Sequence, residues 1–479
     1  MQKLFRSSRN YQLSVLFAIV CYLLFSGFVA IVYPEKVPAL LISLFVFIVL
    51  AAILKNGFGV AAILTLLFVL PFNLTFRLPL SLGLYDPYVN GQYINYLVPT
   101  GSIIDVWVAF ALLVALQKEI RAVSRKTLAL IHSVTVLVLV YVLISSFAFD
   151  SFVTAVTVIR GVLYFALFVV LMKYSCKWLT INRLRFVAQW LFVGALIQAA
   201  IGFLQFERGT WVGLPWLGES LVSAGTPGSA SVTLGGNLYL RAYGTFQHPN
   251  ILAGFLLLCF LLFVYLGFEL RKELLFKIFA LFILIFTSLT FSRTALFAEF
   301  IVLCLYLLRS LIRVASSLYR NSFAMIGFTP FLKRFTDSVG ASDIAYSDRL
   351  ALMKASLNII LKNSFGVGPG VFVRSLAGNP VLSASGQLLL QPVHNIFLLL
   401  ISEYGLFIGI MAVTAFCGYF IWGLFNSQYK VYTFCVVLAV ILLGSLDHYL
   451  VTTQQGFLVL MGLLGLVGLP SIAFQRSVS

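Results

Sequence analysis

Four arginines stand in or beside apolar segments of the chain, where a charged side chain is costly. They are Arg160, Arg241, Arg293 and Arg349, and each falls near the predicted outer edge of the membrane. An arginine in such a place costs a few kcal/mol unless it finds a partner. A guanidinium binds a phosphate through two parallel hydrogen bonds and stays charged. The four arginines therefore indicate a pocket for a diphosphate.

Structural ion pairing is the alternative explanation for these arginines, because carboxylates could neutralise them without any role in chemistry. The acidic residues near the predicted outer edge or in the adjoining spans are Asp150, Glu207, Glu299, Asp348, Glu403 and Asp447. The residues alone leave both explanations open.

His394 occupies the mouth of a predicted membrane helix. The pair His394-Asn395 leads directly into the apolar run 396–409, and a segment rich in Gly, Ser and Pro, 378–392, precedes it. An interfacial hydrogen bond is the simpler role for a histidine at a span boundary. The setting of His394, between a polar segment and a helix, favours a role in chemistry. The other histidines are His132, within a predicted span, and His248 and His448, at span boundaries.

The sequence predicts no metal site and no cofactor. It has no Asp-x-Asp, no His-x-x-x-His and no clustered carboxylates in the predicted outer segments, so arginines rather than Mg²⁺ or Mn²⁺ must neutralise a phosphate-bearing leaving group. Gly366-x-Gly368-x-Gly370 lacks the following helix and lysine of a nucleotide-binding loop. All six cysteines lie in apolar segments or at their edges, which argues against a disulfide framework or a zinc site.

The composition places these residues in a membrane protein. Hydrophobic residues make up 61% of the 479 residues and charged residues 10%, with a mean hydropathy of +1.04. A bilayer core of roughly 30 Å needs about 20 apolar residues per helical span, and helices satisfy their own backbone hydrogen bonds in lipid. We therefore expect an all-α polytopic protein, a bundle of about 12–14 transmembrane helices with a large outer loop that contains short amphipathic helices.

The net charge of +17 does not indicate a nucleic-acid partner. The excess of Lys and Arg lies in the segments predicted to face the cytoplasm, where basic residues orient membrane proteins. The N-terminal apolar run, Leu13 to Val32, is too long for a signal peptide and lacks a small-residue cleavage site, so we interpret it as the first span.

Four regions follow from the apolar and polar segments. Residues 1–149 and 150–332 hold N-terminal and central spans, 333–394 form the large outer loop, and 395–479 hold the C-terminal spans. The predicted spans are 12–33, 37–54, 57–76, 102–117, 128–149, 152–173, 186–206, 250–268, 277–291, 294–312, 395–424, 431–448 and 452–469. The outer segments 77–101 and 207–249 complete the polar face.

Two elements can be recognised in the outer segments, and a short apolar run precedes the large outer loop. Residues 232–240 read as a hairpin with a Gly-Gly turn. A short amphipathic helix, started by Ser347 or Asp348 and ended by the glycines at 366–370, presents an apolar stripe that suits a membrane surface. The run 323–332 is too short for an ordinary span, although the topology needs a crossing there. A broken, short or re-entrant helix is the expectation for it.

Several of these residues occur together in an order that resembles a known family. The motifs are Arg241-Ala242-Tyr243-Gly244-Thr245-Phe246-Gln247-His248-Pro249-Asn250 opening a span, Ser292-Arg293 between spans, Asp348-Arg349 followed by Gly366-Val367-Gly368-Pro369-Gly370, and His394-Asn395 through Glu403-Tyr404-Gly405. Their order and spacing, over roughly residues 150–470, resemble the O-antigen ligase and O-antigen polymerase superfamily. Members are bacterial inner-membrane enzymes that transfer glycans from a polyprenyl-diphosphate carrier at the outer face.

The resemblance implies a metal-independent, inverting glycosyltransferase with a GT-C-like helical bundle and an outer loop that roofs the site. Arg241, Arg293 and Arg349 would bind the donor diphosphate, with Arg160 as a further contact, and His394 would be the general base. Cations lower the barrier as the diphosphate leaves, and a neutral imidazole accepts a proton near neutral pH. The acceptor would be a lipid-linked sugar or a protein hydroxyl, for a ligase, a polymerase or a protein O-glycosylating enzyme.

Two other functions remain possible from the residues. A transporter or flippase of a lipid-linked glycan would use the arginines as transit sites, but such proteins usually show internal repeats and broken helices near the midplane. The sequence has no repeat, and its candidate residues gather at one face. A scaffold of an envelope-assembly complex would leave the arginines and His394 without a joint role. We therefore expect partners to be the glycan donor, its acceptor and membrane lipid, and no nucleic acid.

Overall fold

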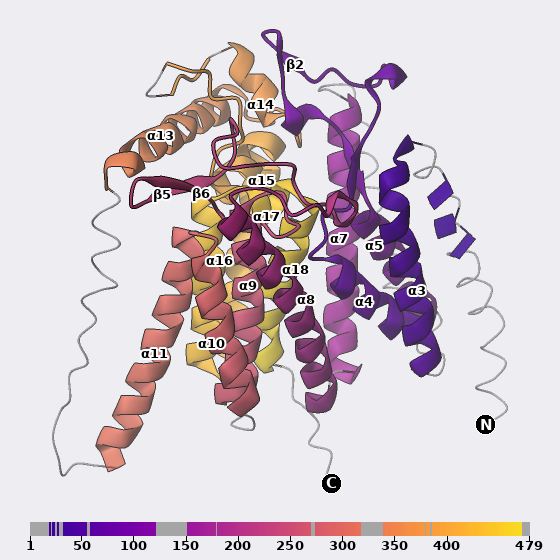
Figure 1. Cartoon of the computed structure of the whole chain (residues 1–479), viewed down its shortest axis with the longest axis vertical. Coiled ribbons are helices and arrows are strands. Elements are labelled where there is room, and N and C mark those ends of the chain that lie inside the picture. The colour runs from indigo at the N-terminus through magenta and orange to yellow at the C-terminus, as the bar shows by residue number, and fades with distance from the viewer. Residues whose placement is uncertain are drawn as a thin grey trace.

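The computed structural model describes residues 32–54, 58–120, 151–178, 180–269, 274–317, 339–378, 380–383 and 386–471, and scattered positions between 19 and 27. Most of them are helical (Figure 1). Five helices in this part of the chain are long and apolar enough to cross a membrane, namely Pro34–Ile53, Phe152–Met172, Ile181–Arg208, Pro249–Gly267 and Ile396–Asn426. The protein is therefore a helical membrane protein, and the larger predicted number of spans stays a prediction.

The helices follow one another along the chain as α3 (Val37–Ile53), α4 (Phe58–Val69), α5 (Ile103–Ile120), α7 (Ser151–Trp178), α8 (Ile181–Arg208), α9 (Pro249–Val264), α10 (Leu274–Ser288), α11 (Arg293–Ser317), α13 (Val339–Lys362), α14 (Phe372–Ser375), α15 (Ile396–Asn426), α16 (Lys430–Leu446), α17 (Tyr449–Thr452) and α18 (Gln454–Gly468). Helices occupy most of each predicted span within the described ranges, but the predicted span 57–76 is helical only to Val69 and ends in the short strand Thr75–Arg77. The predicted span 128–149 lies outside the described residues, as does most of 12–33.

Short strands pair within the outer segments. They are β1 (Thr75–Arg77) with β4 (Thr100–Ser102), β2 (Tyr88–Val89) with β3 (Gln92–Tyr93), and β5 (Ser231–Leu234) with β6 (Asn237–Leu240), all antiparallel. The predicted hairpin over 232–240 is confirmed by β5 and β6. Its turn residues, Gly235 and Gly236, both have positive φ angles, which is the backbone that a two-residue hairpin turn requires.

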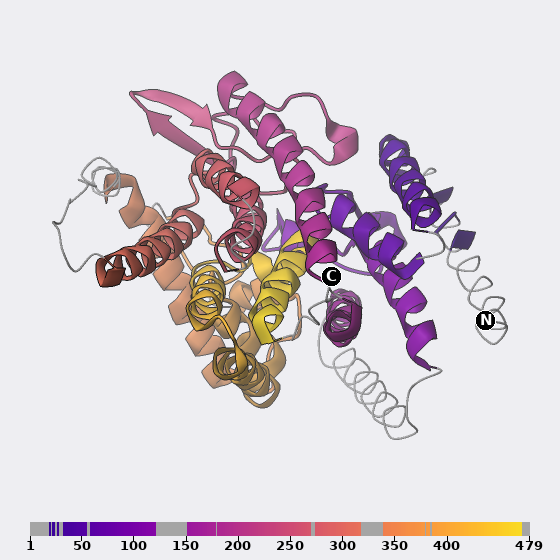
Figure 2. The same cartoon turned by 90° about the horizontal axis from the view of Figure 1, so that it is seen from below.

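Helix α9 forms the centre of the main bundle. Almost every residue from Pro249 to Val264 is buried, and the helix packs against α8, α10, α11 and α18. A helix that is apolar on all sides can be buried in a core or can span a membrane, and its neighbours bury α9 almost completely. A second group, α3, α4, α5 and α7, packs around the buried Trp107. Figure 2 shows the helices end-on, with the N-terminal group beside the main bundle.

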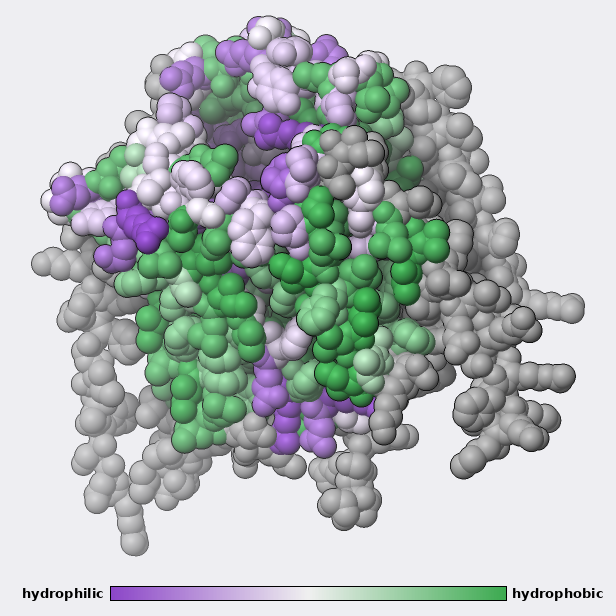
Figure 3. Space-filling view, turned by 45° about the vertical axis from the view of Figure 1, so that its right-hand side comes forward, coloured by the Kyte–Doolittle hydropathy of each residue, from purple (hydrophilic) through white to green (hydrophobic). Residues whose placement is uncertain are grey.

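A roof of short elements covers one end of the bundle. Helix α13 lies across the helical bundle rather than along it, and α14 and the segment around β2 lie beside it (Figure 1). Buried apolar residues join these parts, among them Leu97, Leu352, Phe372 and Val393. Below the roof, a band of apolar residues crosses the visible face. Hydrophilic residues follow it at the opposite end of the bundle (Figure 3). This band has the character of a surface that contacts lipid hydrocarbon.

The helix of the large outer loop is longer than the sequence predicts. The amphipathic helix begins at Val339, so the predicted start at Ser347 or Asp348 is wrong. Those two residues lie inside α13, because the helical segment extends further toward the N-terminus than its apolar stripe indicated. The run 323–332 lies outside the described residues. Helix α13 nevertheless lies at the end of the bundle where α11 begins, not where α11 finishes (Figure 1).

Helix α15 is broken at Gly405, whereas the sequence predicted one continuous span over 395–424. Gly405 has φ 83° and ψ 170°, a conformation that only glycine adopts readily. The chain after α13 fills the break: Val367 and Gly368 donate backbone hydrogen bonds to the carbonyls of Ser402 and Glu403, at 2.9 and 3.0 Å. These bonds satisfy carbonyl groups that the broken helix leaves without intrahelical partners.

Replacing Gly366 by alanine is expected to destabilise this junction strongly. A Cβ atom at Gly366 would lie 2.4 Å from the Glu403 carbonyl oxygen and 2.5 Å from the Gly405 nitrogen, and its φ is +84°. Both atoms belong to the backbone, so relief requires the two segments to separate. We expect a loss of about 3 kcal/mol or more, at the top of the usual range for one substitution, measured as a lower thermal unfolding midpoint in detergent.

The matched control is Gly378→Ala, in the same outer loop, where an added Cβ would meet no atom within 4 Å. We expect this variant to melt as the wild type does. Equal melting of the two alanine variants would show that the junction between the loop and α15 does not contribute to stability.

Candidate active site

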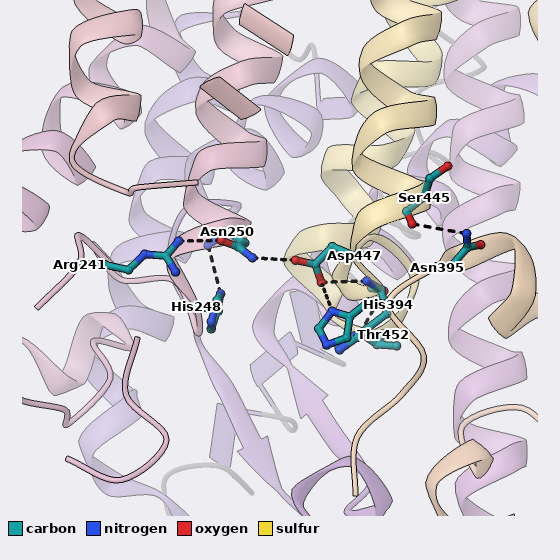
Figure 4. Close-up of polar contacts among 9 residues, drawn as sticks. Arg241, His248, Asn250, His394, Asn395, Ser445, Asp447 and Thr452 are labelled. Atoms are coloured by element: carbon teal, nitrogen blue, oxygen red, sulfur yellow. Dashed lines mark hydrogen bonds and ion pairs between the residues drawn. The ribbon is translucent and has the colours of Figure 1, made fainter. Parts of the chain in front are cut away.

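A chain of polar contacts links Arg241 to His394 (Figure 4). The Arg241 guanidinium donates to the Asn250 side-chain oxygen at 2.8 Å, and the Asn250 amide donates to Asp447 Oδ2 at 2.7 Å. His394 Nδ1 lies 3.6 Å from Asp447 Oδ1, just beyond hydrogen-bond reach. Residues from two of the predicted motifs therefore meet at Asp447, which the sequence indicated only as a charge able to neutralise an arginine.

The segment that carries Arg241 is fixed by two buried glutamines of α8. Gln205 accepts hydrogen bonds from the backbone of Tyr243 and Gly244 at 3.0 and 2.8 Å. Gln198 accepts from the Thr245 backbone at 2.7 Å. Unpaired buried amides are costly, so these bonds determine one backbone path for the segment. The Arg241 side chain is then held at its Nε by the Thr290 carbonyl, at 2.6 Å.

Arg241, Arg293 and Arg349 lie close enough to act on one another electrostatically. Burial lowers the pKa of Arg241 to about 10, and the positive charges of Arg293 and Arg349 act in the same direction. Arg293 is the first residue of α11 and Arg349 lies on α13. Three arginines from three separate elements thus share one region, and α11 adds the partial positive charge of its N-terminus.

His394 precedes the first turn of α15. Asn395 caps that helix by accepting hydrogen bonds from the backbone of Phe397 and Leu398, both at 3.0 Å, as N-cap asparagines do. The Asn395 amide also donates to the Ser445 carbonyl at 3.4 Å. The cap fixes where α15 begins and therefore fixes the direction in which the His394 ring leaves the backbone.

Asp447 is the acidic residue of the site. Burial alone would raise the pKa of its carboxyl, but His394 beside it and the neighbouring His448 and His248 outweigh burial and hold the pKa well below its usual range. Asn250 and the backbone N–H of His448 also donate to its two oxygens, at 2.7 and 2.8 Å. Donated hydrogen bonds favour the ionised form, so Asp447 is a carboxylate that can stabilise a positive charge on His394.

Burial favours the neutral form of the other two outer histidines. Burial lowers the pKa of His248 to about 4, and Arg241 adds to that effect. Burial lowers the pKa of His448 to about 3, against the smaller opposing effect of Asp447. His248 Nδ1 accepts the Asn250 backbone N–H at 3.1 Å, which fixes the N-terminus of α9. His248 therefore has the structural role that sequence reasoning favoured for a boundary histidine.

Arg160 lies elsewhere. Its Nε is 3.1 Å from Asp105 Oδ1, its NH2 group donates to the Thr100 carbonyl, and Tyr164 donates to the same carboxylate at 2.8 Å. No hydrogen bond or ion pair among the described residues joins Arg160 directly to Arg241, Asp447 or His394. Structural ion pairing accounts for Arg160, and its contact with a diphosphate stays a prediction.

Two further acidic residues near the predicted site are engaged in other contacts. Glu299 accepts from the Thr287 hydroxyl at 2.9 Å. Glu403 is buried at the break in α15, where the backbone N–H groups of Gly370 and Phe372 donate to it. Neither carboxylate contacts Arg241, so the positive charges of the site are not cancelled by these two residues.

Three residues of the site could hold a metal ion. His394, Asp447 and His448 each offer one ligand atom, and these atoms all lie within 4.8 Å of one another. The sequence predicted no metal site because Asp447 and His448 lie far from His394 along the chain. Neighbouring arginines raise the local positive potential, which opposes the binding of a dication.

The residues that sequence reasoning did not assign are Gln198, Gln205, Asn250 and the pair Asp447-His448. Gln198 and Gln205 are seven residues apart in an apolar helix, so they lie on the same face, and this spacing was an available signal. No protein-family model matches the chain, and no curated protein matches it. The assignment therefore depends on the residues and their geometry.

Proposed function

We propose that the protein is a metal-independent inverting glycosyltransferase that moves a glycan from a polyprenyl-diphosphate carrier to an acceptor hydroxyl. The observation that carries the proposal is the contact chain from Arg241 through Asn250 and Asp447 to His394. This chain joins a guanidinium, a group that suits a leaving diphosphate, to an imidazole, a group that suits a base. We further propose that the enzyme lies in the bacterial inner membrane, with a GT-C-like polytopic fold and this site at the outer face.

The arginines supply the donor half of the reaction. As the bond between the sugar and the diphosphate breaks, negative charge grows on the diphosphate oxygens. Arg241, which Thr290 and Asn250 hold in place before the reaction, stabilises that charge in the transition state together with Arg293 and Arg349. The N-terminus of α11, where Arg293 lies, adds backbone N–H groups that favour an anion.

His394 supplies the acceptor half. Its imidazole takes the proton of the acceptor hydroxyl while that oxygen forms a bond to the anomeric carbon. The bond from the same carbon to the diphosphate oxygen breaks, and polyprenyl diphosphate leaves from the opposite side. This single displacement inverts the configuration at the anomeric carbon. Asp447 is a positioning residue that stabilises the imidazolium, as the carboxylate does in other histidine-carboxylate pairs.

The place of the site in the fold suits a lipid-linked donor. Helices α9 and α15, which begin next to His248 and His394, start at the end of the bundle that α13, α14 and their neighbours cover (Figure 1), while the bundle below presents an apolar band (Figure 3). A polyprenyl chain can then remain in lipid while its diphosphate meets the arginines. The first turn of α8, with Arg183 and Arg185, lies at the opposite end, as basic residues do on the cytoplasmic side.

Transport of a lipid-linked glycan is the second candidate, and the break in α15 favours it, because transporters bind substrates at discontinuous helices. The two functions differ in what becomes of the donor. A transporter moves the intact donor across the bilayer, whereas the proposed enzyme separates the glycan from the diphosphate.

The direct test uses purified protein in liposomes with a labelled polyprenyl-diphosphate oligosaccharide. The acceptors offered are a lipid-anchored sugar core, a second lipid-linked glycan and a peptide with Ser and Thr. We expect product with one of them, and unchanged product formation after EDTA treatment. Movement of the intact donor across the bilayer without product would establish transport instead. Activity that EDTA abolishes and Mg²⁺ restores would contradict the metal-independent mechanism.

A further inference from the structure

His394, Asp447 and His448 form a compact set of nitrogen and oxygen ligands. His394 precedes α15, whereas Asp447 and His448 follow α16, and one ligand atom from each lies within 4.8 Å of the others. The two imidazole rings are 4.9 Å apart between centroids. The buried Nδ1 of His394 has no hydrogen-bond partner in the part of the chain that the structure describes. A buried nitrogen that makes no hydrogen bond among the described residues and lies 3.6 Å from Asp447 Oδ1 can share a metal ion with that carboxylate.

Neighbouring side chains already orient two of the ligands. Thr452 Oγ1 lies 2.9 Å from His448 Nδ1, which leaves Nε2 of His448 for a metal ion. Asn250 donates to Asp447 Oδ2 at 2.7 Å, which leaves Oδ1 on the side of His394. Metal sites commonly have such outer partners, which fix the direction of each ligand. Two of the three ligands, Asp447 and His448, are therefore oriented before any metal ion binds.

Two imidazoles and one carboxylate select zinc among the common divalent ions. Ca²⁺ and Mg²⁺ prefer oxygen ligands alone, whereas zinc combines nitrogen and oxygen ligands at about 2.0–2.1 Å. Tetrahedral zinc at such bond lengths brings its ligands to about 3.3 Å from one another. Rotation of the two imidazole rings can supply most of this contraction. Three protein ligands leave the fourth position open, as in reactive rather than purely structural zinc sites.

We propose that His394, Asp447 and His448 bind Zn²⁺ and that the bound ion reversibly inhibits the protein. A nitrogen lone pair of His394 that binds zinc cannot accept a proton from an acceptor hydroxyl. The binding site stands on geometry alone, whereas inhibition rests on the proposed function. The positive charges of Arg241, Arg293 and Arg349 weaken the attraction of a dication, so the ion exchanges with solution instead of serving as a permanent part of the fold.

The first experiment measures binding without reference to transfer. Full-length protein is purified without a polyhistidine tag, treated with EDTA, desalted and titrated with Co²⁺, whose visible absorption reports ligands in a tetrahedral site. Zn²⁺ then displaces the cobalt. Cys417→Ser is the background, because that thiol is exposed. We expect one ion per chain and an affinity at least about tenfold weaker in His448→Gln, since even outer partners contribute that much.

Matched variants separate this site from other histidines. His248→Gln changes the same residue type outside the three ligands, and we expect it to keep the cobalt spectrum. His394→Gln is a second ligand variant in case His448→Gln fails to fold, which size-exclusion chromatography reveals. Absence of saturable binding up to about 1 mM, or equal binding by wild type and both ligand variants, would overturn the proposed site.

Transfer measured in parallel decides the inhibitory role. We expect Zn²⁺ to stop product formation over the concentrations at which it displaces cobalt, and EDTA to restore it. If zinc binds but does not slow transfer, the metal site is confirmed, and His394 is excluded as the general base. If wild-type protein transfers no glycan at all, the proposed function fails, while the cobalt titration still decides whether the metal site exists.

Discussion

Glycan transfer by His394→Ala is expected to be about 100- to 10,000-fold slower than transfer by the wild type, the usual contribution of a positioned acid or base. The reason is that the acceptor hydroxyl would lose the group that takes its proton, while the arginines that bind the donor remain. The rate constant kcat should therefore fall much more than the KM for the donor rises. The measurement is initial product formation at several donor concentrations, with a wild-type sample beside it.

A structural effect of the substitution must be distinguished from a chemical one. Truncation of the ring leaves a space next to Asp447, and added imidazole can enter it and accept the proton. We expect imidazole to restore part of the activity of His394→Ala and to leave the thermal unfolding midpoint unchanged. Transfer at the wild-type rate by the alanine variant would exclude His394 as the base.

Arg293→Lys is expected to lower kcat for transfer by about 100-fold or more, the usual cost of losing one donor to a developing anion. The substitution keeps the charge but removes the planar fork that binds two phosphate oxygens at once. Arg293 begins α11 and is exposed, so the variant should fold normally. The measurement is transfer from the lipid-linked donor, together with the affinity of the protein for that donor.

The control substitution lies on the same helix. Arg309→Lys, four turns further along α11, changes a guanidinium that stacks over Tyr306 at 6.0 Å and lies away from the site. A lysine can keep such a cation–π contact, and we expect near-normal transfer. If Arg293→Lys also transfers normally, Arg293 does not bind the diphosphate through its guanidinium, and the site reduces to Arg241 and Arg349.

Local patterns in the sequence predicted the elements that local physics determines. The predicted span 250–268 corresponds to α9, Pro249–Val264, and to the π-helical segment Tyr265–Glu269 that extends it. The hairpin of β5 and β6 followed from its glycines. Both predictions depend only on residues that are close together in the chain. The hydrophobicity and backbone freedom of such residues follow directly from their types.

The break in α15 could not be predicted in the same way. The run 395–424 is apolar apart from Glu403, and single glycines are common in membrane helices. What breaks the helix is a separate segment, 363–370, that enters at Gly405 and takes over hydrogen bonds of the helix. Glu403, a carboxylate within an apolar run, was the one local sign that this part of the helix has an unusual neighbour.

The candidate site was predicted as a set of residues but not as an arrangement. The sequence assigns Arg241, Arg293, Arg349 and His394 to the outer edge. In the structure Arg241 and His394 are linked through Asn250 and Asp447, and Arg293 and Arg349 lie within electrostatic range of Arg241. The pairing of His394 with Asp447 depends on how α15 packs against α16, which hydrophobic periodicity does not specify. Arg160 has the same local setting as the others, yet Asp105 on α5 pairs with it. Residue type therefore indicated the kind of chemistry, whereas helix packing determined which of the residues lie in the same site.

The bond between Asn250 and Asp447 also bears on how the protein is made. The two residues are 197 positions apart in the chain, and a ribosome adding about 5–20 residues per second needs about 10–40 seconds to cover that length. During this interval Arg241 and Asn250 have already been synthesised, while their carboxylate partner does not yet exist. The half-made protein therefore passes through a stage with uncompensated polar groups among its apolar helices. At that stage a membrane protease or insertion chaperone can distinguish it from the finished molecule.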